Sequence, residues 1–413
     1  MSWVRLTVLM CLAHILSMTG FSTYPALLAE LRDAWGMTNF QAGLVSGVFF
    51  AGYMVSVVVL TTLTDVFDVR RVYAASCALA AAGGLGFALL ADGVWSASLF
   101  QAMAGAGVAG TYMPGLKALA ERLPGRGQGR AVAFYTSSFG IGASVSLLLA
   151  GVLQAPLGWK GVFVISALGP LAAGALVLRG LAPRAPRTAR ETVPSAGFGS
   201  VLTNRAAMSY VAGYVVHCWE LFGLRSWLVV FLAFGMSAGT LTPRLTWEPA
   251  SVAAAINLAA PVASILGNEV ATRFGRRRVV LAMVGISGAV GCITGFSALF
   301  SPLAVVVAAS VYFVLVMSDS SALTAGVVAA APAHQRGAVM AVHSFFGFGA
   351  GLVAPLVFGS VLDLAGGGAS ALAWGLAFAS LGLPGLVGAV VTALRERKRR
   401  RLARVRSRLG DFH

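Results

Sequence analysis

The sequence is poor in charge. Only 11% of its 413 residues are Asp, Glu, Lys or Arg, whereas about a quarter of the residues in a soluble domain are charged. Hydrophobic residues make up 58% of the chain, and its mean hydropathy is +0.84. A chain of this size with so few charges could not cover its surface in water, but lipid accepts apolar side chains that face outward. The composition therefore excludes a soluble globular protein and predicts a membrane protein built of α-helices.

Acidic residues and cysteines are especially scarce. The chain has 14 acidic residues against 30 basic ones. Its four cysteines lie in separate apolar segments, with neither the paired spacing of disulfides nor the spacing of metal ligands. The sequence also has no catalytic triad, metal-binding cluster or phosphate-binding loop. We therefore predict a protein that is not an enzyme and that uses no metal or other cofactor.

Long apolar segments recur along the whole chain. A helix that spans a membrane needs about 20 mostly apolar residues, and the 50 glycines would let such helices pack closely. At the N-terminus the alternative is a signal peptide, but the apolar run continues to about residue 29 without a convincing cleavage site. The twelve predicted spans are 6–29, 41–62, 72–90, 95–118, 131–153, 161–178, 207–233, 247–267, 279–299, 303–328, 339–362 and 371–394.

The predicted spans fall into two groups of six. The segment between them, 179–206, contains three prolines and five arginines, which favours a linker. We therefore expect an all-α membrane protein with two pseudo-symmetric six-helix bundles, residues 1–178 and 207–394, joined by a cytoplasmic linker. Residues 395–413 would form a basic cytoplasmic tail.

Basic residues gather on one side of the predicted membrane. Most of the 30 Lys and Arg residues lie in the tail, the linker and the loops on the side of both termini. By the positive-inside rule both termini are then cytoplasmic, and we expect the cell's inner (plasma) membrane. Nine basic residues among 395–408 favour contact with anionic lipids. Nucleic acid is not an expected partner, because the tail has no interleaved aromatic residues and no folded module around it.

The two groups of spans resemble each other at a constant offset of 207 residues. Residues 139–143 read FGIGA, and residues 346–350 read FGFGA. Gln128 corresponds in the same way to Gln335. A single offset at separate places indicates a duplicated six-helix unit. In transporters with this architecture the solute site lies near the bilayer midplane between the halves, and rocking of the halves alternates access to it.

Two loops at equivalent positions carry a more specific pattern. Residues 61–71 read TTLTDVFDVRR, and residues 268–278 read NEVATRFGRRR. Together they resemble the signature loop of the major facilitator superfamily, roughly G-x-L-A-D-R-x-G-R-R/K. The first copy has Asp68 in place of the inner Gly, and the second has Thr272 in place of the Asp. Through span count, linker and repeat, the resemblance covers the whole chain and implies a transporter with the fold of that superfamily.

The resemblance also implies a role for the two loops. In the superfamily, their Asp and basic residues latch the cytoplasmic ends of the two halves in the outward-facing state. The corresponding gating-loop residues here are Asp65, Arg70, Arg71, Arg273 and Arg277. The alternative is a basic cluster that only sets the topology. Drug efflux is disfavoured, because Gln101 replaces an Arg of many proton-coupled members and residues 139–145 lack the Gly-Pro motif of drug–proton antiporters.

Three ionisable residues lie in the predicted seventh span. An ionisable residue at the bilayer centre costs roughly 2.5–3.5 kcal/mol, so each one suggests a function. His217 and Glu220 lie about 15 and 20 Å from the start of the span, near its middle, and their spacing puts them on one face. Arg225 lies about 27 Å in, near the outer edge. Its forked guanidinium suits a carboxylate or a similar anion, although a side chain at this depth could also snorkel.

Asp319 lies midway along the predicted tenth span. The repeat relates it to Tyr112 in the fourth span. In the superfamily, spans one, four, seven and ten line the central cavity, so the resemblance implies that Tyr112 and Asp319 face each other there. His14 in the first span and Lys117 at the cytoplasmic end of the fourth are further candidates, for which packing and boundary anchoring are the alternatives. His343, in the eleventh span, falls outside the expected lining, and we assign it no role.

These residues lead to a predicted function. A carboxyl that has lost its water favours the protonated form, so Glu220 or Asp319 could load a proton on one side and release it on the other. We predict a monomeric secondary active transporter of rocker-switch type, proton-coupled as a symporter or antiporter, that moves a small polar solute such as an organic or inorganic anion. The alternatives are an efflux antiporter for drugs or amphipathic cations, and a transport-inactive scaffold or sensor. The substrate-binding or proton-coupling candidates are His14, Tyr112, Lys117, His217, Glu220, Arg225 and Asp319.

Overall fold

The structure is a computed structural model, and it describes residues 2–123, 128–183, 201–237, 247–332 and 335–410. Its described residues form helices joined by short connections, and no strand occurs among them. The helices of the first half are α1 (Trp3–Ser17), α2 (Thr23–Ala34), α3 (Asn39–Val66), α4 (Val69–Leu90), α5 (Val94–Arg122) and α6 (Gln128–Gly180).

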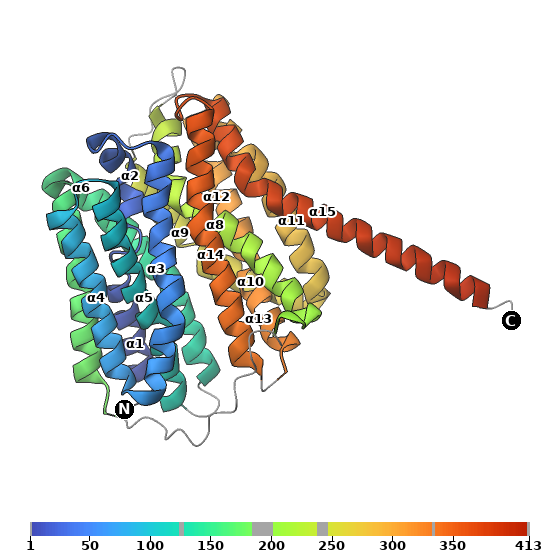
Figure 1. The fold of residues 1–413 in the computed structure, drawn as a ribbon, viewed down its shortest axis with the longest axis horizontal. Coiled ribbons are helices and arrows are strands. Elements are labelled where there is room, and N and C mark those ends of the chain that lie inside the picture. Colours follow the sequence, from blue (N-terminus) through green and yellow to red (C-terminus); the bar gives the residue numbers. More distant parts are fainter. Residues whose placement is uncertain (1, 124–127, 184–200, 238–246, 333–334, 411–413) are drawn as a thin grey trace.

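The second half begins with α8 (Arg205–Ser237). It continues with α9 (Pro249–Asn257), α10 (Ala260–Phe274), α11 (Arg276–Thr294), the short 3₁₀-helix η2 (Gly295–Leu299), α12 (Pro302–Ser318), α13 (Ser320–Ala330), α14 (Arg336–Leu364) and α15 (Ala371–Gly410). Figure 1 shows the first half, in blue to green, beside the second half, in yellow-green to red. The halves meet mainly where α3 packs on α14, α6 on α9 and α2 on α8.

The helices account for the twelve predicted spans. Within the described residues, nine helical segments are long and apolar enough to cross a membrane. One of them, α6, contains two spans, because its path bends at Gly158, where φ is +61°. The pair α1 and α2 makes one further span, and α5 makes another. The prediction of a twelve-helix, all-α membrane protein is confirmed.

Three spans are interrupted near their middle, which the sequence did not lead us to predict. The first span breaks between Ser17 and Thr23, the eighth between Asn257 and Ala260, and the tenth at Asp319 alone. At the first break the backbone N–H of Ser22 donates to the hydroxyl of Ser146, so a side chain from α6 replaces a lost helical bond. Broken helices in transporters place backbone and polar groups near the midplane.

The structure describes the predicted linker and the predicted basic tail only in part. Residues 184–200, most of the predicted linker, lie outside the described residues. The apolar span of the last helix is Ala371–Arg395, close to the predicted 371–394, but α15 continues beyond it as one helix to Gly410. Figure 1 shows this end of α15 leaving the bundle. Residues such as Ala, Leu, Arg and Lys have high helix propensity, which allows the helix to continue into the basic segment.

The bundle has two ends, which hold different connections between the helices. The terminus side holds the N-terminus and the connections α3–α4 and α10–α11. The far side holds the connections α2–α3, α4–α5 and α14–α15.

Candidate functional site

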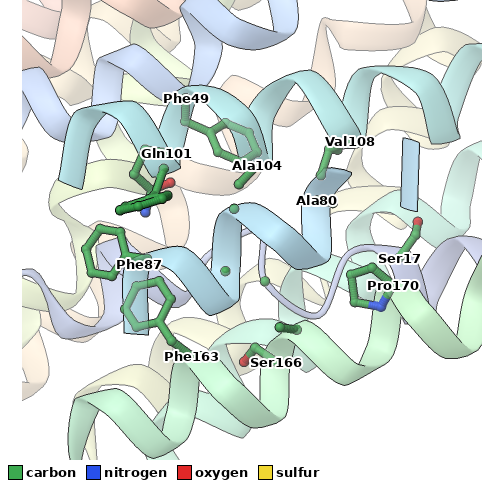
Figure 2. Close-up of a pocket in the computed structure, with 15 residues that line it drawn as sticks. Ser17, Phe49, Ala80, Phe87, Gln101, Ala104, Val108, Phe163, Ser166 and Pro170 are labelled. Atoms are coloured by element: carbon green, nitrogen blue, oxygen red, sulfur yellow. The ribbon is translucent and has the colours of Figure 1, made fainter. Parts of the chain in front are cut away.

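A pocket inside the first half contains none of the candidate residues. Figure 2 shows Phe87, Gln101, Phe163, Ser166 and Pro170 around it. Its volume is only about 20 Å³, which is room for about one water molecule. It is therefore a gap in the packing of α1, α3, α4, α5 and α6, and a solute site has to be sought between the halves.

His217 and Asp319 form a buried pair in the second half. The Nδ1 atom of His217 in α8 lies 2.6 Å from Oδ1 of Asp319 and 3.0 Å from the carbonyl oxygen of Val316. Both oxygens accept, so Nδ1 must carry the proton. The two side chains are only 2% and 1% exposed. This pair joins two of the predicted site residues from different spans.

Asp319 lies at the break of the tenth span. It follows the last residue of α12 and precedes the first residue of α13. Its second carboxylate oxygen, Oδ2, is buried and has no partner among the described residues. The neighbouring hydroxyl of Ser318 donates instead to the carbonyl of Leu315. The carboxylate is therefore not satisfied by local hydroxyls, and Oδ2 remains available to a proton or to a donor on a solute.

Glu220 has different partners from its neighbour His217. The two were expected to share a face, but Glu220 points into the interior of the second half. Its Oε2 accepts from the hydroxyl of Ser287 in α11 at 2.8 Å, and its Oε1 lies 3.3 Å from the hydroxyl of Tyr312 in α12. The residue is 0% exposed. These contacts tie three helices of one half together and do not reach the first half.

We expect Glu220 to matter more for folding than for coupling. Glu220→Gln should keep transport within about tenfold of wild type, because the isosteric amide oxygen still accepts one hydroxyl. Glu220→Leu should lower the free energy of unfolding by about 1–3 kcal/mol, because both hydroxyls lose their acceptor. Thermal unfolding in detergent measures the second effect, with Glu269→Leu on the surface as the control. A folded Glu220→Gln protein without proton movement would instead put the coupling proton on Glu220.

His14 is the centre of a matching cluster in the first half. Its Nδ1 lies 2.7 Å from the hydroxyl of Ser138, and that hydroxyl already donates to the carbonyl of Tyr135. Nδ1 must therefore be the donor, which leaves Nε2 as an acceptor; this atom is buried without a partner. The His14 ring stacks on Tyr135 at 4.7 Å and lies 5.3 Å from Tyr112, between ring centroids. In each half, a His in the first span of that half thus contacts the candidate residue in its fourth span: His14 contacts Tyr112, and His217 contacts Asp319.

Arg225 lies where the two halves meet. The helix α8 runs from Arg205 to Ser237, so Arg225 is about 6 Å beyond its middle residue. The predicted span put Arg225 about 27 Å from its start, and along α8 the distance is about 30 Å, so a depth near the outer edge stays a prediction. The guanidinium carbon lies 5.7 Å from the ring centroids of Phe139 in the first half and of Phe313 in the second. Its Nε is buried without a partner, and it forms no salt bridge with a described residue.

Tyr214 and His343 extend the cluster around His217. Tyr214 stacks on His343 at 3.6 Å and on His217 at 5.6 Å, between ring centroids. The Nδ1 atom of His343 is buried without a partner. Sequence reasoning missed Tyr214, although it lies three residues before His217 on the same helical face. Sequence reasoning also left His343 out of the site, because the eleventh span was not expected to line the cavity. The structure shows that a residue of such a span can still contact one beside the site, as His343 contacts Tyr214.

The predicted gating-loop residues pair within their own halves. Lys117 in α5 contacts the carboxylate of Asp65 and donates to the hydroxyl of Thr64. Arg70 bonds Asp68 at 2.9 Å, and Arg273 bonds Glu269 at 2.8 Å. Asp68 also accepts from the N–H of Arg70 and caps α4, which explains an acid at the place of the expected Gly.

Arg71 and Arg277 stand at the starts of α4 and α11, on the same side of the bundle. Arg71 is exposed. The latch that the resemblance implies thus stays a prediction for a different state of the protein.

The sequence is similar to that of known transport proteins. A model described as the Major Facilitator Superfamily matches residues 10–248, which is more than half of the chain. A putative metabolite transport protein from Haemophilus influenzae is 24% identical over 139 residues, which is 34% of this chain and 34% of that protein. The match thus spans about a third of the length of that curated relative.

Solved structures extend the likeness to almost the whole chain. One is a bacterial homolog of the human lysosomal transporter Spinster, inward-facing and unoccupied; the TM-score is 0.75 at 14% identity, over 95% of each chain. Another is a POT family transporter in complex with a thioalcohol-conjugated peptide, with a TM-score of 0.75 at 14% identity over 95% of this chain and 96% of that one. At this identity the likeness shows the fold. Together with the sequence match, it shows that the chain belongs to the major facilitator superfamily and is a multi-pass secondary transporter, not an enzyme.

Proposed function

We propose that this transporter couples the movement of a small organic anion to protons. The observation that carries the proposal is the charge arrangement around the middle of α8. His217 there holds a buried Asp319 that has one free oxygen, while Arg225, two turns further on, has no acidic partner among the described residues. One group can take a proton and the other can take an anion.

The proton site follows from the His217–Asp319 pair. With a neutral imidazole the pair carries one negative charge, and a proton on Oδ2 removes it. A buried unpaired charge is costly, so the pair should be occupied either by a proton or by a favourable neighbour. Because Asp319 lies at a break in a span, a shift of α12 against α13 can change which side supplies that proton. Coupling then requires that the anion and the proton stabilise the same state.

The solute class follows from what surrounds Arg225. The buried acids of the second half already have partners, Ser287 and Tyr312 for Glu220 and His217 for Asp319. The arginine is the group that still needs a counter-charge, which favours an anion over the amphipathic cations of an efflux pump. Phenyl rings flank it from both halves. We therefore propose an organic carboxylate with an apolar body rather than an inorganic anion.

The orientation and the partners belong to the same proposal. The excess of basic residues favours a cytoplasmic terminus side, with both termini inside the plasma membrane. The basic end of α15 would then contact anionic lipids, and a monomer suffices for a site between two halves of one chain. In this orientation the far side faces outward, and the hydrogen bonds that join Asn39 and Phe40 of the first half to Asp363 and Gly367 of the second half lie there.

The test uses purified protein in liposomes that enclose a pH-sensitive dye. Small aliphatic and aromatic carboxylates, inorganic anions and amphipathic cations are added outside one at a time. We expect carboxylates to drive proton movement and the other two classes to leave the dye unchanged. Proton movement driven by cations alone would establish efflux. Tracer flux of a carboxylate without proton movement would make the protein an uncoupled facilitator.

A further inference from the structure

A carboxylate of one half caps a helix of the other half on the far side. Asp363 is near the end of α14, and Asn39 is the first residue of α3. The Oδ1 atom of Asp363 accepts from the backbone N–H of Asn39 at 3.0 Å and from its Nδ2 at 2.8 Å. Its Oδ2 accepts from the backbone N–H of Phe40 at 2.8 Å. One side chain thus receives three hydrogen bonds across the boundary between the halves.

The position suits a negative charge. The first N–H groups of a helix have no partner within it, and its N-terminus carries a partial positive charge. Thr38 and Gln41 form a capping box that satisfies a different part of this first turn. The Nη1 atom of Arg32 donates to Oδ1 of Asn39 at 2.9 Å, which orients the amide so that Nδ2 faces Asp363. The start of α3 is therefore prepared for an acid that the other half supplies.

Close packing of α3 on α14 supports the same contact. Gly43 and Gly47 lie one turn apart on α3, and a methyl group at either would overlap a carbonyl oxygen of α14, that of Pro355 or of Leu352. A methyl group at Gly359 of α14 would overlap the carbonyl oxygen of Asn39. Small residues of this kind let two spans approach to backbone contact. The helices α3 and α14 can pack this closely because the residues at these three contact positions are glycines.

The close contact of the two helices covers the far side and the middle, where Tyr53 of α3 stacks on Phe348 of α14 at 3.9 Å between ring centroids. Toward the terminus side, Val55, Val59 and Val66 of α3 are 66%, 57% and 65% exposed. Phe345 and Phe346, at the same end of α14, are 45% and 43% exposed. Figure 1 shows α3 and α14 close together toward the far side and diverging toward the terminus side. Separation of the two helices at the far side would break the bonds to Asp363.

We propose that Asp363, with the N-terminus of α3, is the latch that holds the far side closed. Asp363 is a positioning residue that contacts no solute; it acts by setting the balance between the state closed on the far side and the state open there. The inference rests on the proposed alternating access, and it needs neither proton coupling nor an anionic solute. Loss of charged hydrogen bonds on this scale should shift that balance by about tenfold or more.

Pulsed EPR distances in lipid nanodiscs test the latch without any substrate. Spin labels at Trp95 and Leu372, both exposed on the far side, report that end, and labels at Phe67 and Phe274 report the terminus side. In Asp363→Asn we expect the far-side distance to lengthen and the terminus-side distance to shorten. Asp92→Asn removes an exposed far-side acid whose partner, Ser96, lies in its own half, and it should change neither distance.

Two milder variants keep the test decisive. Asn39→Ala removes one of the three bonds and should give a smaller shift in the same direction, even if Asp363→Asn folds poorly. Gly47→Ala obstructs the close contact without a change of charge and should also favour the open far side, whereas Gly388→Ala, with no atom within 4 Å of the new methyl, should not. Unchanged distances in both Asp363→Asn and Asn39→Ala would overturn the latch. If proton movement is absent from liposomes but the distances shift, the coupling proposal fails and the latch stands.

Discussion

Liposomes that contain Asp319→Asn should no longer move protons with the solute, although they should still exchange labelled solute for unlabelled solute. The amide cannot carry a proton at neutral pH, so the coupled step has no carrier. Its oxygen can still accept the bond from Nδ1 of His217, at the place of the present 2.6 Å contact, so the helix break should keep its geometry. Proton-driven accumulation should fall by at least about tenfold, which corresponds to about 1.4 kcal/mol of lost coupling free energy.

The comparison of two assays makes this prediction specific to coupling. Dye acidification reports proton movement, and counterflow of a radiolabelled carboxylate reports solute movement alone. Asp92→Asn is a matched control, because Asp92 is an exposed acid on the far side whose partner, Ser96, lies in its own half. Wild-type acidification by Asp319→Asn would contradict the proposal directly. Loss of both activities in a folded variant would show that Asp319 binds the solute itself.

The fold could be predicted from the sequence because it depends on features that extend over many residues. Apolar runs of about 20 residues have one stable arrangement in lipid, and the offset of 207 residues relates the two groups of spans. The breaks at residues 18–22, at 258–259 and at Asp319 were not predictable in this way. A break leaves the apolar run intact, and its lost backbone bonds are replaced by distant groups, such as the hydroxyl of Ser146 for Ser22.

The sequence predicted which residues belong to the candidate site, but it did not predict which of them contact each other. His217, Glu220 and Asp319 were chosen because an ionisable side chain within a membrane span costs free energy, and all three are buried. That His217 pairs with Asp319, while Glu220 turns to Ser287, depends on how α8, α11 and α12 pack, and spacing within one helix says nothing about this. Asp363 was not among the candidates at all, because an acid at a span end resembles an ordinary surface residue until its partners on α3 are known.

Arg225→Gln should raise the solute concentration for half-maximal transport by ten- to a hundredfold or more. Hydrogen bonds to a charged group contribute about 1.5–3 kcal/mol each, and about 1.4 kcal/mol is one factor of ten. Arg225→Lys should recover part of the loss, because it restores the charge without the forked donor geometry. Phe139→Leu, which removes one of the two flanking rings, should have a smaller effect, since a cation–π contact contributes about 0.5–2 kcal/mol. Initial uptake rates over a range of carboxylate concentrations measure all three.

Stability separates a binding role of Arg225 from a structural one. A half-buried cation whose Nε is buried and which has no acidic partner among the described residues costs folding free energy, and an apolar residue of similar size often stabilises such a site. Arg225→Met should therefore raise the midpoint of thermal unfolding in detergent while it abolishes transport. If Arg225→Met instead lowered the midpoint, the guanidinium would be holding the halves together through Phe139 and Phe313. If Arg225 lowers the stability of the fold and is still required for transport, the solute is the anionic partner that its guanidinium binds.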